Sequence, residues 1–227
     1  MPDICEWTRS FFLGASPVTG GKITTKTNMS GTIRTFIAFE LPPAVIALLD
    51  KVQQDLGRLK IRARWVRPAN IHLTLKFLGD INPDHIDKIG LAMAGVAGDF
   101  SPVTLSVRGV GVFPGIKRPR VIWVGLGGDV RSLCAFQSRL EEKLAGAEFP
   151  KDTRSFKAHL TLGRIKQAAN PAVIRQMITD YAGLSSEEFT FNQVILFKSD
   201  LQPSGAVYSK LKQTRLGMTN DEWRMNN

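Results

Sequence analysis

The sequence predicts an α+β fold of two similar lobes, each with an antiparallel or mixed sheet backed by helices, around a central cleft. Segments with strand-like alternation interleave with segments of helical periodicity along the chain. The order of strands and helices runs through the chain as two roughly equivalent halves. The tetrapeptide His-Leu-Thr-Leu occurs once in each half, at residues 72–75 and 159–162. This repeat predicts that the two strands face each other across the cleft.

The first half of the chain opens with a strand over residues 33–40. Two prolines end this strand, and Pro43 suits the first turn of the helix that follows. Apolar residues at every third or fourth position predict that helix. The later elements of this half are a strand over 61–66, a turn over 67–70, a strand over 71–78, a helix over 83–96 and a strand over 103–112.

The second half begins after a loop of proline, glycine and basic residues over 113–120. Asp129 is a suitable N-cap for a helix that runs to about residue 144, and Asn170 is one for a helix that ends near residue 181. The strands predicted in this half cover residues 121–126, 158–163, 189–198 and 206–214.

The two ends of the chain do not share this pattern. We interpret residues 1–28 as a flexible extension, because proline and a Gly-Gly pair interrupt them and no apolar period follows. Met29 is then a candidate for the true start, which mass spectrometry of the natively expressed protein would test. We expect the two-lobed domain to cover residues 29–216 and a polar tail to cover residues 217–227.

Composition narrows the classes of partner and compartment. The formal net charge of +10 predicts an anionic partner, with nucleic acid or a phosphorylated small molecule ahead of a membrane surface. A basic surface that binds nothing is the alternative. The two cysteines are far apart, and no apolar run approaches the length of a membrane span. We therefore expect a cytoplasmic protein without disulfides and without membrane contact. We also expect a monomer.

The repeated tetrapeptide carries the chemistry. Alternation along a strand places His72, Thr74 and Lys76 together on the open face, and places the leucines and Phe77 on the core face. The second copy presents His159 and Thr161 in the same way. The two copies contain two of the three histidines in the chain. This repetition favours a functional role for both imidazoles over a purely structural one.

Two imidazoles that meet across a cleft can act as general base and general acid, because imidazole titrates near neutral pH. Threonine hydroxyls beside them can donate to the non-bridging oxygens of a phosphate, and Lys76 adds positive charge. The sequence thus predicts attack on a phosphodiester with no metal and no other cofactor.

A metal site and a binding role are the alternatives. His72 and His159 could be two ligands of zinc, which needs three or four, and a carboxylate could complete the set. We interpret His85, the remaining histidine, as a surface residue of a helix. Trp65 and Trp123 lie in strand patterns and are expected in the core or as a stacking platform for bases. A non-catalytic module that binds RNA or nucleotides in the same cleft also stays open.

These motifs together resemble the RNA 2′,3′-cyclic phosphodiesterases, also called the 2′-5′ RNA ligase group, within the two-histidine phosphoesterase superfamily. The resemblance extends from about residue 32 to residue 216. The stretches that carry it are residues 35–42, 65–79, 121–125, 156–164 and 196–201, with Gly205 and Tyr208 near the end. Ala158 stands where the family often has proline.

The resemblance implies a bilobal fold with pseudo-twofold symmetry and a basic cleft. It implies hydrolysis of RNA 2′,3′-cyclic phosphate ends, or of related cyclic nucleotides, to a 2′-phosphate, with reversible 2′-5′ ligation in some relatives. His159 would be the base and His72 the acid, while Thr74 and Thr161 hold the phosphate. Lys76 and Arg164 are candidate substrate contacts.

Overall fold

The computed structural model describes residues 31–59, 61–203 and 205–217 and confirms the α+β class. The strands are β1 (Ile33–Glu40), β2 (Ala63–Trp65), β3 (His72–Ile81), β4 (Val103–Phe113), β5 (Val121–Gly128), β6 (Leu160–Ile165), β7 (Phe189–Phe191), β8 (Gln193–Gln202) and β9 (Gly205–Arg215). The helices are α1 (Pro43–Gly57), α2 (Ile86–Ala97), α3 (Val130–Ala145) and α4 (Pro171–Asp180), with 3₁₀ turns η1 (Pro68–Asn70) and η2 (Pro83–His85). The predictions for residues 1–28, for Met29 and for the tail beyond Gly217 lie outside the described residues.

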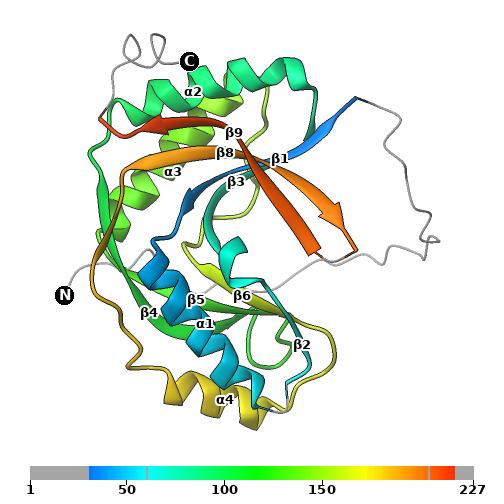
Figure 1. Ribbon diagram of the computed structural model, residues 1–227. Coiled ribbons are helices and arrows are strands. Elements are labelled where there is room, and N and C mark those ends of the chain that lie inside the picture. The colour runs from blue at the N-terminus through cyan, green and yellow to red at the C-terminus, as the bar shows by residue number, and fades with distance from the viewer. Residues whose placement is uncertain (1–30, 60, 204, 218–227) are drawn as a thin grey trace. The chain divides into compact units, whose positions relative to one another are not determined.

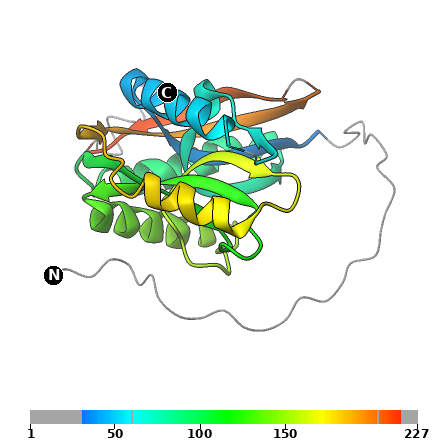
Figure 2. The ribbon, with the colours of Figure 1, turned by 90° about the horizontal axis from the view of Figure 1, so that it is seen from below.

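The strands form two sheets, and every pairing in them is antiparallel. The first sheet has the order β3-β1-β8-β9 and the second the order β2-β6-β5-β4-β7. Figure 1 shows α2 and α3 beside the first sheet and α1 and α4 beside the second. In Figure 2, α1 and α3 lie on opposite sides of the strands. Within the described residues, no helix is both long and apolar enough to cross a bilayer.

The two sheets do not correspond to the two halves of the sequence. Strands β2 and β4 belong to the first half but lie in the second sheet, whereas β8 and β9 complete the first sheet. The prediction that each half forms its own sheet is therefore wrong. The repeat survives in a smaller unit, because β1-α1-β3 and β5-α3-β6 each place the later strand antiparallel beside the earlier one. Strand β8 then covers the free edge of β1, as β4 covers that of β5.

The predicted strand over residues 189–198 is in fact two strands in different sheets. Strand β7 pairs with β4 in the second sheet, and β8 pairs with β1 in the first. Only Asn192 separates them. The crossover brings Phe191 onto the ring of Phe39 from β1, with centroids 4.7 Å apart and the rings stacked. The two sheets therefore share one continuous apolar core.

Local signals at the helix ends are confirmed. The side chain of Asp129 accepts a hydrogen bond from the Ser132 amide at 3.0 Å, and that of Asn170 accepts one from the Ala172 amide at 2.9 Å. Trp123 is buried in the core as expected.

Both His-Leu-Thr-Leu segments contain a bulge at their last leucine. In β3, Lys76 and Thr74 have successive partners on β1, which leaves Leu75 without one. In β6, Gly163 and Thr161 have successive partners on β5, which leaves Leu162 without one. A bulge inserts one residue into the pleat, so side chains beyond it point to the opposite face from the one that strict alternation predicts.

A glutamine amide holds the carbonyl of each bulged leucine. Gln137 of α3 donates to Leu75 O at 3.3 Å, and Gln53 of α1 donates to Leu162 O at 2.7 Å. Gln53 also donates to Val66 O at 2.8 Å. Both glutamine side chains are buried. Each bulge is thus stabilised by the helix that follows the central strand of the other sheet.

The bulge in β3 turns Lys76 into the interior. Its side chain is 4% exposed, and its ammonium donates to Glu141 Oε2 at 2.7 Å and to Pro150 O at 2.9 Å. Glu141 also accepts from the amide of Asp152 at 3.2 Å. The prediction that Lys76 shares the face of His72 is therefore wrong, because alternation does not continue through the bulge. We do not retain Lys76 as a substrate contact.

We expect Lys76→Met to lower the free energy of unfolding by about 3 kcal/mol or more, because it leaves Glu141 buried without its countercharge. Urea denaturation measures this change. Arg139→Gln removes a cation from the exposed pair with Glu142 and serves as the control, with an expected change of about 0.5 kcal/mol or less. Equal stability losses in the two variants would contradict the structural role given to Lys76.

Candidate active site

A cavity of about 350 Å³ collects residues from both copies of the motif. His72 and Thr74 of β3 line it, together with Thr161 and Arg164 of β6. The two motifs, 87 positions apart, therefore border one space, as the repeat predicted. The remaining lining residues are Arg34, Thr35, Phe36, Val66, Asn70, Ile71, Phe77, Gly79, Ser199, Leu201, Ala206 and Tyr208.

His159 lies immediately before β6 and two residues before Thr161, so alternation places the two side chains on one face. Its ring is half-buried and meets the ring of Phe113 edge-on at 5.0 Å between centroids. Lys157 lies over the same Phe113 ring at 5.6 Å. His159 itself is not among the residues that line the cavity, whereas Thr161 and Arg164 of the same segment are.

Both histidines are oriented by the same hydrogen bond. His72 Nδ1 lies 2.8 Å from Asn70 O, and His159 Nδ1 lies 2.6 Å from Lys157 O. A carbonyl oxygen can only accept, so each Nδ1 carries a proton and donates. In the neutral ring, Nε2 then holds the lone pair and is the atom that can take up or release a proton. The two motifs present equivalent, pre-oriented imidazoles.

Aromatic rings enclose His72. The Phe36 ring stacks on it at 4.6 Å between centroids, and Tyr208 meets it edge-on at 5.3 Å. Burial lowers the pKa of His72 to about 4, although the Asn70 carbonyl acts in the opposite direction. In the free protein His72 is therefore neutral at pH 7.

His159 has a different environment. Burial lowers its pKa, the Lys157 carbonyl opposes this shift, and the positive charge of Arg164 lowers the pKa further. Burial also raises the pKa of the Tyr208 hydroxyl, while Arg164 and Arg34 oppose that change. The two arginines thus supply positive charge at the same cavity from opposite sheets.

The bulges decide which residues beyond the motifs reach the cavity. Arg164 and Phe77 stand at equivalent positions, five residues after their histidines, and both line the cavity. The prediction that Phe77 faces the core is wrong, because its side chain is 59% exposed. Gly163 occupies the position equivalent to Lys76 in the other copy. A Cβ at residue 163 would come within 2.9 Å of the Trp65 ring, so only glycine allows β6 to pack this closely against β2.

Chemical reasoning from the motifs missed several cavity residues. Arg34 lines the cavity from β1, and no motif marked it. Tyr208 lines it from β9 and was named only as part of the family resemblance, without a role. Asn70 also lines it, and its side-chain amide donates to Ala206 O at 2.8 Å. That bond fixes η1 against β9 and so positions the carbonyl that orients His72.

Among the described residues, no group of three or more His, Cys, Asp or Glu side chains is placed to hold a metal ion. His85 is exposed on η2, as expected, and its ring lies edge-on to Phe149 at 5.7 Å. It therefore does not join His72 and His159.

The family of the chain follows from comparison with known proteins. The family model described as LigT like Phosphoesterase matches residues 39–123 and 128–208. The chain belongs to this family. The resemblance drawn from its motifs is thereby confirmed. A relative from Aquifex aeolicus, named RNA 2′,3′-cyclic phosphodiesterase, is 28% identical over 188 residues, which cover 82% of this chain and 98% of the relative. One of the same name from Archaeoglobus fulgidus is 31% identical over 180 residues, covering 79% and 98%.

Solved structures agree on the fold. The protein TT0787 of Thermus thermophilus superposes with a TM-score of 0.63 at 27% sequence identity, covering 82% of this chain and 98% of that one. LigT of E. coli, solved with 3′-AMP, superposes with a TM-score of 0.61 at 22% identity, covering 82% and 99%. The predicted bilobal two-histidine phosphoesterase fold is therefore confirmed.

The low pKa of His72 predicts a dependence of stability on pH. Below about pH 6.5 the unfolded chain protonates His72 while the folded protein does not, so the stability present above that pH is lost as the pH falls towards about 4. The loss attributable to His72 is at most about 3 kcal/mol. Urea denaturation at about pH 7 and about pH 4.5 should show a smaller loss for His72→Gln than for the wild type. Equal losses would contradict burial of a neutral imidazole.

Proposed function

We propose that this protein hydrolyses the 2′,3′-cyclic phosphate at RNA ends to a 2′-phosphate. The observation that carries the proposal is a pair of imidazoles held by equivalent Nδ1 bonds in two copies of one motif, of which the first borders the cavity through His72 and Thr74 and the second through Thr161. A cyclic phosphodiester needs a base for the attacking water and an acid for the leaving oxygen, and such a pair can supply both. The names of the relatives from Aquifex aeolicus and Archaeoglobus fulgidus support the same substrate.

The proposed step is in-line attack of water on phosphorus. His159 Nε2 removes a proton from the water as its oxygen bonds to phosphorus. The bond from phosphorus to the 3′ oxygen breaks, and protonated His72 Nε2 gives its proton to that oxygen. The hydroxyls of Thr74 and Thr161 donate to the non-bridging oxygens, where charge increases. Arg164 adds a positive charge on the cavity wall.

His72 must be protonated for this role, although it is neutral in the free protein. A bound phosphate is anionic, and a nearby negative charge favours the protonated imidazole. Substrate binding would thus raise the pKa of His72 from about 4 and prepare the acid. Ligation through a 2′-5′ linkage would use the same cyclic phosphate with a 5′-hydroxyl in place of water: the 5′ oxygen bonds to phosphorus and the 3′ oxygen leaves. Cleavage of a 2′-5′ linkage would be the reverse of that step.

The proposal predicts that His72→Ala and His159→Ala each lower turnover of RNA with a 2′,3′-cyclic end by about 100-fold or more, with a chelator present throughout. Product mass and phosphate position report the reaction. His85→Ala is the matched control, because this exposed histidine lies on η2 and not in the cavity. Turnover near the wild-type level in either motif variant would refute the assigned roles. Loss of wild-type activity on chelation would favour a metal-dependent reaction, and binding without turnover would favour a binding module.

The proposal also predicts a difference between two pH profiles. The profile of kcat/KM reports the free enzyme, in which the pKa values of both histidines are lowered, whereas that of kcat reports the complex with the anionic substrate. We therefore expect the optimum of kcat to lie at a higher pH than the optimum of kcat/KM. Steady-state kinetics across the pH range measures both. An optimum of kcat on the acid side of that of kcat/KM would be the contrary result.

A further inference from the structure

Four cations lie on strands β2 and β6 or directly beside them, and they form a ladder that continues from the cavity: Arg62, Arg64, Arg164 and Lys166. Arg64 lies directly opposite Arg164 in the register of the two strands. The amide of Lys166 donates to Arg62 O at 2.8 Å, which adds the next rung. Residues directly opposite each other, and residues two apart on one strand, share a face. Because Arg164 lines the cavity, Arg62, Arg64 and Lys166 lie on the face that leads away from it.

This arrangement has a cost within the protein. All four side chains are exposed, and like charges placed directly opposite each other destabilise a sheet. Within the described residues no carboxylate forms an ion pair with any of them. The ladder therefore lacks a countercharge in this part of the chain.

Protection of a sheet edge does not account for the ladder. Charged residues on an edge strand prevent pairing with other chains, and β2 is the edge strand of the second sheet. Arg164 and Lys166, however, belong to β6 and the residue after it, and β6 is paired on both sides. Edge protection would need charged residues only on β2. Here the cations of both β2 and β6 lie on the same face of the sheet.

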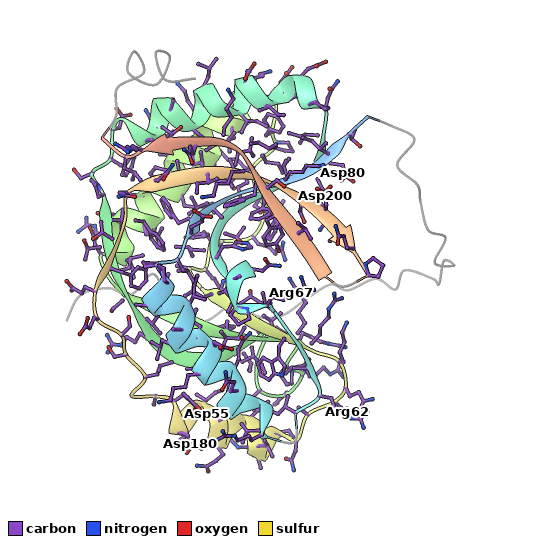
Figure 3. All side chains as sticks on the ribbon, in the orientation of Figure 1. Asp55, Arg62, Arg67, Asp80, Asp180 and Asp200 are labelled. Atoms are coloured by element: carbon purple, nitrogen blue, oxygen red, sulfur yellow. The ribbon has the colours of Figure 1, made fainter. Side chains whose placement is uncertain are left out.

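We propose that Arg62, Arg64 and Lys166 bind backbone phosphates of the RNA chain whose cyclic end occupies the cavity. This inference rests on the proposed function. A 2′,3′-cyclic phosphate is the 3′ end of its chain, so all other phosphates lie on its 5′ side and must leave the cavity in one direction. Successive rungs are two residues apart, about 6.6 Å along a strand, which suits contacts to consecutive phosphates. In Figure 3, the labelled Arg62 lies well away from Arg67 beside η1.

The ladder would give the enzyme a preference for RNA chains over cyclic mononucleotides as substrates. A mononucleotide can occupy the cavity but has no phosphate that reaches Arg64 or Arg62. Contacts to the backbone are electrostatic and independent of base sequence, so they should act on KM and on salt dependence. They should leave the chemical step, and with it kcat at saturation, almost unchanged.

The test compares two substrates, an RNA of about eight nucleotides with a 2′,3′-cyclic end and a 2′,3′-cyclic mononucleotide. The variant is Arg62→Gln/Arg64→Gln/Lys166→Gln. We expect the ratio of kcat/KM for the RNA to that for the mononucleotide to fall by about tenfold, mainly through KM. The slope of log kcat/KM for the RNA against log salt should become shallower by about 2, because three contacts to a single strand are lost.

The control removes the same charge elsewhere. Lys51→Gln/Arg131→Gln/Arg175→Gln changes three exposed cations on α1, α3 and α4. If net charge alone attracts RNA, this control will lower the ratio as much as the ladder variant does, and the inference is overturned. An unchanged ratio in the ladder variant overturns it too.

Failure of the ladder can be distinguished from failure of the proposed function. If the wild type hydrolyses both substrates and the ratio is insensitive to the ladder, the function stands and the inference fails. If the wild type hydrolyses neither, the proposed function fails, and the ladder is then judged by binding. Fluorescence anisotropy of a labelled single-stranded RNA should give a Kd about tenfold weaker for the ladder variant than for the control variant. Equal Kd values would overturn the ladder.

Discussion

Two hydrogen bonds from glutamine amides to bulged leucine carbonyls underlie the arrangement of this molecule. A buried carbonyl without a partner costs about 1–3 kcal/mol, and each bulge removes Leu75 or Leu162 from its strand register. Gln137 and Gln53 supply the missing donors, each from the helix that follows the other central strand. The same contacts therefore stabilise the bulges and join the two sheets. Because the bulges set which side chains beyond the motifs face the cavity, the composition of the candidate site depends on them.

The repeat is symmetric in its backbone and asymmetric in its chemistry. Both imidazoles are oriented by a carbonyl two residues earlier, yet His72 is packed among aromatic rings while His159 lies under the charge of Arg164. At the position equivalent to Arg164 the other copy has Phe77. A reaction that needs both a base and an acid is better served by two histidines in unlike environments than by two identical ones. The repeated motif thus gives both imidazoles the same orientation, and the different residues after the bulge, Phe77 and Arg164, give them different environments.

The sequence predicted the α+β class, the bounds of β1, the caps of α3 and α4, and the meeting of the two motifs, because local periodicity and the repeated tetrapeptide report these directly. The predicted side-chain directions were wrong after the bulge in β3, where one extra residue reverses the alternation. Alternation assigned Lys76 to the cleft and Phe77 to the core, and the bulge at Leu75 exchanges them. The division of residues 189–198 between two sheets was equally hidden, because Asn192 is a weak interruption and the choice of partner strand depends on free sheet edges. Gln53 and Gln137 carry no sequence signal, since their role exists only once the helices are packed.

The central claim is that two imidazoles from distant segments act on one phosphorus atom. The most direct measurement is a crystal structure of the protein with a non-hydrolysable 2′,3′-cyclic phosphate analogue bound. The account predicts Nε2 of His72 and of His159 on opposite sides of the same phosphorus, each within hydrogen-bond distance of an oxygen on it, with the hydroxyls of Thr74 and Thr161 on its non-bridging oxygens. An analogue that contacts only one of the two motifs, or that binds outside the cavity, would contradict it.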